Sequence, residues 1–513
     1  MPIINQENSC RILANEQYPR LFVYEKNRQM IISTEKPETE NCVFQIPNFT
    51  AQDFGDPEFK KEYGLKYALY GGAMANGIAS ADMVIALGKA GCMGSYGSGG
   101  MRLEVVAQEI DKIKAALGSK PYMVNMLSSR SAEMELKLAQ LLIEKNVPAV
   151  EASAYIVPSE ALVYFRVKGI YQDPNGKIII PHKIIAKVSR EEVLEKFVSP
   201  PNPETVASLE KAGLISPAEA ALASKIPMAD DITAEADSGG HTDGRPLVSM
   251  LPALIALANR KQQEFGYQKK VRVGAGGGVG TGLSCLGAFE LGAAYVVTGS
   301  VNQGCVESGT SDYVKQVLAE TAMADVTMAP CADMFEMGAK VEVIKKKTMY
   351  PQNAQKLYEY YVKYPSFEAI PAPERERIEK KILKDSFDNI WNGTKEYFSR
   401  VDPGKIPQAE KNPKLKMALV FRWYLGNASR WAVQGDPDRR FDMQIWCGQA
   451  MGAFNLWVKG TPLEQAENRH VDTVAELMLN SCAYHYMKSL LLRMGVSPET
   501  FREDILDTRF NLK

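Results

Sequence analysis

Residues 271–282 have the sequence VRVGAGGGVGTG, in which a short β-branched run passes into a glycine-rich turn. A helix-like stretch over 282–291 follows, and the next apolar run, 295–298, ends in Gly299 and Ser300. Glycine lets the backbone approach an anion closely, and a helix N-terminus presents N–H groups to it. We therefore predict that these two turns bind a phosphate group.

The sequence around this stretch predicts the α/β class and a (β/α)8 TIM barrel. Eight short apolar runs alternate with helix-like stretches, which is typical of parallel strands joined by crossover helices. In such a barrel the loops after strands 7 and 8 are the frequent phosphate site, and the two turns occupy these positions. An open doubly wound sheet is the alternative, but its glycine fingerprint after the first strand is absent. The predicted strands are 66–70, 91–94, 122–126, 149–152, 183–188, 228–234, 271–273 and 295–298, and the predicted helices are 80–89, 102–117, 132–145, 247–262 and 282–291.

Three zones along the chain differ in residue composition and in predicted secondary structure. Residues 1–60 form an N-terminal extension with short strands, 61–330 the barrel, and 331–513 a helical subdomain whose last helix is expected to pack back on the barrel. Within the barrel zone, the Asn-Gly pair at 175–176 stands between alternating runs and predicts a β-hairpin over 164–180. The short strands are predicted at 21–24 and 43–46, and the late helices at 354–364, 375–397 and 471–494.

Composition excludes several classes of protein. The 513 residues are 45% hydrophobic and 24% charged with a net charge of -1, which is ordinary for a soluble globular protein. A near-neutral chain has no global field for nucleic acid, and no stretch predicts a signal peptide or a membrane span. The eight cysteines are scattered without a C-x-x-C pair, so we expect reduced thiols in a cytoplasmic protein, with no structural zinc site.

A second motif, AEADSGGHTDGRP over residues 234–246, directly follows the sixth predicted strand. Gly239 and Gly240 place His241 on a bare loop at the carboxyl end of the barrel, where barrel enzymes carry out their chemistry. Histidine titrates near neutral pH and can exchange a proton there, although a loop histidine that caps a helix is the alternative. Acidic residues lie nearby in the sequence, but no second His or Cys has ligand spacing, so we predict no metal site.

Three further features fall at the same end of the barrel. Lys187 ends an apolar strand, where its charge can stabilise an anion such as a reduced flavin, unless the side chain only extends to solvent. Asn125, in another apolar strand, can offer a donor and an acceptor to a heterocycle. The bare turn at 71–77 would let a planar ring lie against it, although a tight structural turn explains it equally well. No base accompanies Cys305, which we interpret as a structural thiol.

These segments resemble a family. Together they are similar to the FMN-dependent barrel group that holds nitronate monooxygenases and flavin-type enoyl reductases. The closer resemblance is to trans-acting enoyl reductases of polyketide and polyunsaturated fatty acid synthases, and it covers nearly the whole chain from about residue 60. The resembling segments are GGAMA at 71–75, VNM at 124–126, SGGH at 238–241, GAGGG at 274–278 and TGS at 298–300, and the longer signatures lie at 228–246, 417–424 and 445–455.

The resemblance implies FMN, NADPH as the electron donor, and an enoyl thioester carried on acyl carrier protein. Charge and hydropathy, and not the resemblance, are the grounds on which we expect no nucleic-acid partner and no membrane partner. The resemblance places His241 beside the flavin ring, where it would orient substrate or assist protonation, and makes Lys187 the second catalytic candidate. The cofactor-binding residues that it implies are Gly72, Ala73, Met74, Asn125, Lys187, Ser238, Gly239 and Gly240, with Gly276, Gly277, Gly278, Gly299 and Ser300 around the phosphate.

The helical zone would cover the pocket and dock the carrier protein. Its cationic residues are expected to face an acidic helix of that partner, although a solvated surface is the alternative. Two other functions stay open: a nitronate monooxygenase-type flavin oxidase that uses O₂, and a non-enzymatic phosphate-binding scaffold within a synthase. The long C-terminal zone favours the reductase, because small nitronates need no such cover. The cationic residues are 345–347, Arg422, Arg430, Arg439 and Arg440.

Overall fold

The computed structural model describes residues 3–38, 42–129 and 131–506. The chain divides into two compact units. The first comprises the described residues of Met1–Asp237, Asp243–Gly309 and Ala453–Lys513, and the second comprises Ser238–Thr242 and Thr310–Gly452. The functional division at residues 60 and 330 stays a prediction.

The first unit contains a closed barrel of eight parallel strands, which confirms the predicted fold. Each predicted strand overlaps one strand of the barrel, and parallel pairing of β13 with β4 closes it. The strands in spatial order are β4 (Leu69–Gly71), β5 (Met93–Tyr96), β6 (Met123–Leu127), β7 (Ala149–Ser153), β10 (Lys183–Val188), β11 (Asp231–Glu235), β12 (Arg272–Gly276) and β13 (Val296–Thr298).

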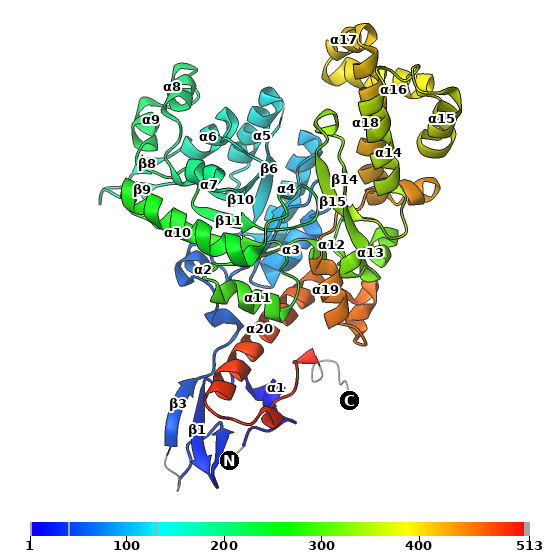
Figure 1. Ribbon diagram of the computed structural model, residues 1–513. Helices are drawn as coiled ribbons and strands as arrows, with labels where there is room; N and C mark the ends of the chain where they lie inside the picture. Colours follow the sequence, from blue (N-terminus) through cyan, green and yellow to red (C-terminus); the bar gives the residue numbers. More distant parts are fainter. Residues whose placement is uncertain (1–2, 39–41, 130, 507–513) are drawn as a thin grey trace. The chain divides into compact units, whose positions relative to one another are not determined.

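Helices surround these strands, as the cyan and green ribbons of Figure 1 show. Their sequences have the expected apolar spacing: one helix buries Val106, Ile110, Ile113 and Leu117 on a single face. All five helices predicted for this zone are present, whereas α6 to α9 and α12 were not predicted. The helices are α3 (Ala81–Lys89), α4 (Leu103–Leu117), α5 (Ala132–Glu144), α6 (Glu160–Val167), α7 (Glu191–Val198), α8 (Pro203–Lys211), α9 (Pro217–Ala223), α10 (Leu247–Phe265), α11 (Gly282–Glu290) and α12 (Ser300–Gln303).

The predicted hairpin over 164–180 is only partly present. Two short strands, β8 (Tyr171–Gln172) and β9 (Ile178–Ile179), flank the Asn-Gly turn. The first predicted arm, 164–171, is wrong over 164–167, because these residues belong to α6. Ser159 caps that helix by accepting the N–H of Leu162, and an apolar run in a buried helix looks like a strand in the sequence.

The last long helix, α20 (Val471–Arg493), packs directly against α11. A Cβ atom on Gly282 would lie 2.2 Å from Oγ of Ser481, so the two helices meet at the glycine backbone. Met30 and Val496 form a β-bridge that joins the N-terminal sheet to the end of α20, where Figure 1 shows it. This sheet has the order β2-β1-β3, with β1 (Arg20–Lys26), β2 (Gln29–Ser33) and β3 (Cys42–Pro47).

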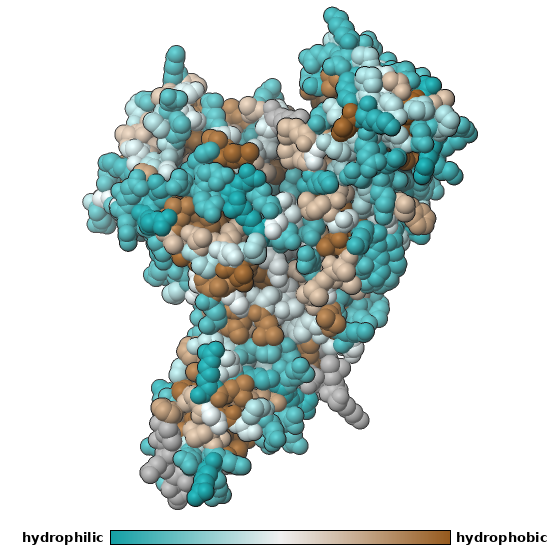
Figure 2. Space-filling model, viewed as in Figure 1, coloured by the Kyte–Doolittle hydropathy of each residue, from teal (hydrophilic) through white to brown (hydrophobic). Residues whose placement is uncertain are grey.

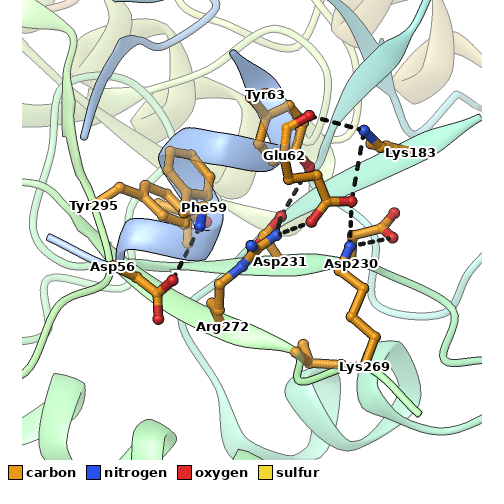
Figure 3. Close-up of polar contacts among 12 residues, drawn as sticks. Asp56, Phe59, Glu62, Tyr63, Lys183, Asp230, Asp231, Lys269, Arg272 and Tyr295 are labelled. Atoms are coloured by element: carbon orange, nitrogen blue, oxygen red, sulfur yellow. Dashed lines mark hydrogen bonds and ion pairs between the residues drawn. The ribbon is translucent and has the colours of Figure 1, made fainter. Parts of the chain in front are cut away.

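A short helix, α2 (Pro57–Tyr63), closes the amino end of the barrel (Figure 3). The ring of Phe59 stacks on that of Tyr295, with 4.2 Å between centroids. The hydroxyl of Tyr63 donates a hydrogen bond to Asp231 at 2.8 Å. These aromatic side chains fill the barrel from below, so any ligand of the barrel must enter at the opposite, carboxyl end.

An ion-pair network lies beside α2, at the first residues of three strands (Figure 3). Arg272 donates to Asp231 at 2.6 Å and to Glu62 at 2.7 Å, while Lys183 and Lys269 pair with Glu62 from either side. Arg272 and Asp231 are both almost fully buried. Buried charges are tolerated only when each is paired, so removing one partner of this network would leave an uncompensated buried charge.

The second unit combines helices with an antiparallel ribbon of β14 (Val326–Pro330) and β15 (Lys340–Ile344). The sequence predicted mostly helix here, and the ribbon was missed. The helix predicted over 375–397 is interrupted, because a π-helical segment, Ile378–Leu383, separates two α-helices. The helices are α13 (Asp312–Ala319), α14 (Tyr350–Lys363), α15 (Ala372–Arg377), α16 (Phe387–Val401), α17 (Lys405–Lys411) and α18 (Pro413–Gln434).

Hydrophilic residues cover most of the face that Figure 2 shows. Among the described residues, no helix is both long and apolar enough to cross a bilayer. The seven cysteines whose side chains the structure describes are all free thiols, and only Cys10 is not buried. This agrees with the prediction of reduced thiols.

Candidate functional site

The glycine turn after β12 packs against backbone at one glycine and faces open space at the next. Gly277 and Gly278 have φ of +83° and +72°, a left-handed conformation that favours glycine. A Cβ on Gly277 would lie 2.6 Å from the carbonyl carbon and oxygen of Ala236, whereas a Cβ on Gly278 would meet no atom within 4 Å. Gly277 is therefore fixed by packing, and Gly278 faces open space.

The turn after β13 lies next to it. Parallel pairing sets Val297 opposite Gly276, and a Cβ on Gly299 would also meet no atom within 4 Å. In the part of the chain that the structure describes, no acceptor takes up the backbone N–H of Gly278 or Gly299. Two open turns with available N–H groups, beside the start of α11, suit a phosphate.

The loop after β4 adjoins the β13 turn, because the N–H of Gly72 donates to the carbonyl oxygen of Thr298 at 2.9 Å. A Cβ on Gly72 would lie 3.1 Å from Cγ1 of Val297, so a side chain there would crowd the barrel. The N–H of Ala73 donates to Oε2 of Glu151 at 2.7 Å. The backbone of Gly72 and Ala73 is thus held in place at the carboxyl end of the barrel, and these two residues carry little side-chain bulk.

Lys187 lies between two carboxylates at the same end. Its Nζ is 2.5 Å from Oε1 of Glu235 and 3.9 Å from Oε1 of Glu151, and its side chain is 16% exposed. Burial opposes its charge, but the two carboxylates outweigh burial and raise the pKa of Lys187 above its ordinary value. The lysine is therefore a cation held by two partners rather than one that extends freely to solvent, and its role toward a ligand stays a prediction.

Asn125 is buried on β6 and differs from the prediction in one respect. Its side-chain nitrogen donates to the carbonyl oxygen of Glu151 at 2.9 Å and to Oγ of Ser153 at 3.0 Å. Both N–H bonds of the amide are therefore used inside the protein. Only its side-chain oxygen is left to meet a ligand, so a paired donor and acceptor contact is not available.

The loop of residues 238–242 belongs to the second unit. A Cβ on Gly239 would lie within 2.8 Å of the backbone of Cys447, and Gly240 exchanges two backbone hydrogen bonds with Glu342 of β15. Oγ of Ser238 is buried and has no partner among the described residues. The loop is therefore tightly fixed, and the hydroxyl of Ser238 can still form a hydrogen bond.

His241 contacts two residues far along the chain. Its Nε2 lies 3.0 Å from Oδ2 of Asp333, and Cys331 is a second hydrogen-bond partner. These two hydrogen bonds raise the pKa of His241 from 6.5 to about 10, against a smaller opposing effect of burial. About half of each of the His241 and Asp333 side chains is exposed, so the charged ring can meet a ligand.

The same three side chains are the one group of His, Cys and acidic donors that the described residues bring within 4.8 Å of one another. The nitrogen–oxygen distance of 3.0 Å is that of a direct hydrogen bond. Two ligands of a tetrahedral zinc ion, each about 2.0–2.1 Å from it, would stand about 3.3 Å apart. We interpret the group as hydrogen-bonded, and the absence of a metal site stays a prediction.

Sequence reasoning missed Glu151, Glu235, Cys331 and Asp333. An acidic residue in the apolar strand 149–153 was the one available signal, because a buried carboxylate needs a partner.

Two of the cations predicted to face a carrier protein have partners within the second unit, and their role in docking stays a prediction. Arg422 lies 3.0 Å from Glu336, and the guanidinium of Arg439 lies over the ring of Trp431, 4.4 Å from its centroid. Cys305 is buried and donates to the carbonyl oxygen of Val301, in keeping with a structural thiol.

Comparison with known proteins gives two family matches. The model for nitronate monooxygenase matches residues 58–385. The model for the inserted helical domain of acyl-carrier-protein S-malonyltransferase matches residues 364–443, within the second unit.

Three relatives are informative. One component of the polyunsaturated fatty acid synthase of Thraustochytrium sp. is 47% identical over 435 residues, which are 84% of this chain and 29% of that protein. Polyketide biosynthesis protein PksE of Bacillus subtilis is 42% identical over 473 residues, 92% of this chain and 61% of that protein. The chain thus spans less than two thirds of either. The solved enoyl reductase domain of MlnA, from the macrolactin biosynthesis cluster of Bacillus amyloliquefaciens, is 37% identical with a TM-score of 0.82, covering 86% of this chain and 99% of that domain.

Proposed function

This chain belongs to the nitronate monooxygenase family, and we propose that it acts as an FMN-dependent enoyl reductase. Its electron donor is NADPH or NADH, and its substrate is an enoyl thioester on a separate acyl carrier protein. The reaction serves polyketide or polyunsaturated fatty acid biosynthesis. Free, buried cysteines support the reducing cytoplasm as its compartment.

The observation that carries the proposal is the pair of open glycine turns after β12 and β13. The N–H groups of Gly278 and Gly299 suit the FMN phosphate, together with Gly276, Gly277 and Ser300 around them. The bare backbone of the loop after β4 leaves room for a planar ring beside it. The residues present therefore fit a flavin mononucleotide at the carboxyl end of the barrel.

When FMN is bound, it supplies hydride transfer between the nicotinamide and the β-carbon of the enoyl thioester. Lys187 keeps a positive charge at the carboxyl end of the barrel and balances negative charge that develops on a ligand there. His241 orients the thioester or assists protonation of its α-carbon. The buried hydroxyl of Ser238 can donate a hydrogen bond to the cofactor or the substrate, or accept one from it.

The relatives support the substrate class. The MlnA relative is an enoyl reductase domain, and the curated relatives belong to polyketide and polyunsaturated fatty acid systems. The helical match to an insert of an acyl-carrier-protein transferase supports a carrier-protein partner for the second unit. Because this chain spans only part of the curated relatives, the partner and the pathway are parts of the proposal.

A steady-state assay tests the proposal against its alternative. We expect purified protein to be yellow and to oxidise NADPH faster when a crotonyl thioester on acyl carrier protein is added. The family model favours nitronate oxidation as the second candidate. That reaction needs no nicotinamide, so oxygen uptake that depends on a nitroalkane, with no response to any enoyl thioester, would replace the first proposal by the second. A colourless protein that cannot be reconstituted with FMN would favour a non-enzymatic scaffold.

A further inference from the structure

The helix that follows the phosphate turn packs on α20 at its very first residue. A Cβ on Gly282 would lie 2.2 Å from Oγ of Ser481 and 2.4 Å from its Cβ, so no side chain separates the two helices there. Figure 1 shows α20, in red and orange, against α11, in green. The position of Ser481 therefore determines where α11 can begin.

The phosphate turn is tied to the same end of α11. The N–H groups of Gly280 and Thr281 donate to Oγ of Ser284 at 2.9 Å and 2.8 Å. The N–H of Ser284 donates back to Oγ1 of Thr281 at 3.2 Å. Gly278, whose N–H we assign to the phosphate, comes two residues before this hydrogen-bonded segment. A displacement at the start of α11 would therefore be passed on to the N–H of Gly278.

Ser481 is held in turn by a carboxylate from the segment after α20. Its Oγ donates to Oδ1 of Asp504 at 3.1 Å. The other oxygen of this carboxylate accepts from Nε1 of Trp457 at 2.8 Å and lies 3.0 Å from Nε2 of His485. One carboxylate thus joins Trp457, α20 and its own segment at the serine that contacts α11.

The surroundings of Asp504 keep it charged. Only 16% of its side chain and 12% of that of His485 are exposed. Burial opposes the charge, but the hydrogen bonds from His485 and Trp457 and the charge of His485 outweigh burial, and they lower the pKa of Asp504. A charged acceptor forms stronger hydrogen bonds than a neutral one, so Asp504 fixes Ser481 firmly at neutral pH.

Other contacts keep the segment around Asp504 in place. The hydroxyl of Tyr484 and Nζ of Lys488 donate to the carbonyl oxygen of Arg502 at 2.7 Å and 2.9 Å. The side chain of Phe501 is buried. A substitution of Asp504 is therefore expected to change the contact with Ser481 without releasing the segment.

We propose that Asp504 is a positioning residue for the cofactor, which sets the phosphate turn through Ser481 and Gly282. This inference rests on the proposed function, because it takes the turn after β12 as the site of the FMN phosphate. The role is indirect, since Asp504 acts on where the N–H of Gly278 lies. Its consequence is selective: binding of a flavin that carries a phosphate depends on Asp504, and binding of a flavin without one does not.

Flavin titration of protein freed of its cofactor tests this role without any turnover. FMN and riboflavin differ only by the phosphate, so the ratio of their dissociation constants isolates the phosphate turn. We expect Asp504→Ala to weaken FMN binding about tenfold and to leave riboflavin binding within about twofold of the wild type, both measured by quenching of flavin fluorescence. Glu503→Ala replaces an exposed acid of the same segment and is the matched control, expected to change neither constant.

Ser481→Ala breaks the same path at its middle. Alanine favours a helix interior, and the substitution removes only the hydroxyl, so the variant is expected to fold. We expect weaker FMN binding with unchanged riboflavin binding here too. Because both substitutions interrupt one path, the double variant with Asp504→Ala is expected to bind FMN no more weakly than the weaker-binding single variant.

Three results would overturn the inference. The first is an equal loss of FMN and riboflavin affinity in Asp504→Ala, which would indicate general loosening of the barrel. The second is a double variant whose losses add. The third is wild-type FMN affinity in Ser481→Ala, which can be measured even if the Asp504 variant does not fold. A wild type that binds neither flavin would instead overturn the proposed function, and it is recognised before any variant is made.

Discussion

The buried carboxylate of Glu151 accepts a hydrogen bond from the backbone N–H of Ala73, with 2.7 Å between Oε2 and N. The other oxygen of this carboxylate lies 3.9 Å from Nζ of Lys187. One side chain of β7 therefore holds the loop after β4 and also balances the cation of β10. Ala73 and Lys187, two candidate contacts for a flavin ring in the first unit, therefore share this carboxylate.

Replacing Glu151 by Ala is expected to destabilise the protein by about 1–3 kcal/mol, because the N–H of Ala73 loses its buried acceptor. Glu151→Gln keeps an acceptor oxygen and is expected to cost less. Urea unfolding of the two variants and the wild type measures the difference. Equal loss in both variants would show that the charge, and not the hydrogen bond, matters at this position.

Gly277→Ala is expected to abolish FMN binding in a folded protein. A Cβ at this position meets the backbone of Ala236 at 2.6 Å, and the φ of +83° is strained for any other residue. Gly287→Ala on α11 is the matched control, since its Cβ meets no atom within 4 Å. Flavin absorbance after gel filtration gives the cofactor content. Full occupancy in Gly277→Ala would remove this turn from the phosphate site.

Lys187→Met is expected to lower the midpoint potential of bound flavin, because a cation that stabilises the anionic reduced form is lost. A loss of about 1.4 kcal/mol corresponds to about 30 mV for a two-electron couple. The raised pKa of Lys187 keeps the wild-type residue charged throughout the neutral range, so this difference should not vary between about pH 6 and 8. Dye-coupled reduction measures the potential, and a variant with an unchanged potential would argue against contact with the ring.

Arg272→Met is expected to destabilise the fold by about 3–5 kcal/mol, because it leaves the carboxylate of Asp231 buried without its cation. Adding Asp231→Asn is expected to recover part of the loss in urea unfolding. Both residues lie at the amino end of the barrel, so protein that remains folded should keep its full FMN content. Loss of cofactor from folded Arg272→Met would contradict this separation of stability from function.

His182 is expected to make the stability of the protein sensitive to acid. Burial lowers its pKa below the 6.5 of an exposed histidine, so the folded protein binds this proton less readily than the unfolded chain. Stability is therefore fully present above about pH 6.5 and declines as the pH falls through that value towards the folded-state pKa. We expect His182→Gln to show a smaller decline than the wild type between about pH 7.5 and 5.5 in urea unfolding. An identical decline in both proteins would assign the acid sensitivity to other groups.

The barrel could be predicted from the sequence because its strands are short, apolar and separated by helices with clear spacing. The ribbon of β14 and β15 could not be predicted. In runs such as 340–344 apolar residues alternate with charged ones, but the surrounding sequence has helical spacing. The candidate phosphate turns were found because glycine spacing is local. The partners of His241 and Lys187 were not, because Asp333 and Glu151 reach them only through tertiary folding. A charged side chain in an apolar strand shows that a partner exists, but not which residue it is.

Anaerobic mixing of purified holoprotein tests the central claim most directly. We predict that NADPH bleaches the flavin band and that a crotonyl thioester on acyl carrier protein then restores it, with one saturated thioester formed for each flavin reoxidised. A bleached flavin that no enoyl thioester reoxidises, but that oxygen with a nitroalkane does turn over, would contradict the account.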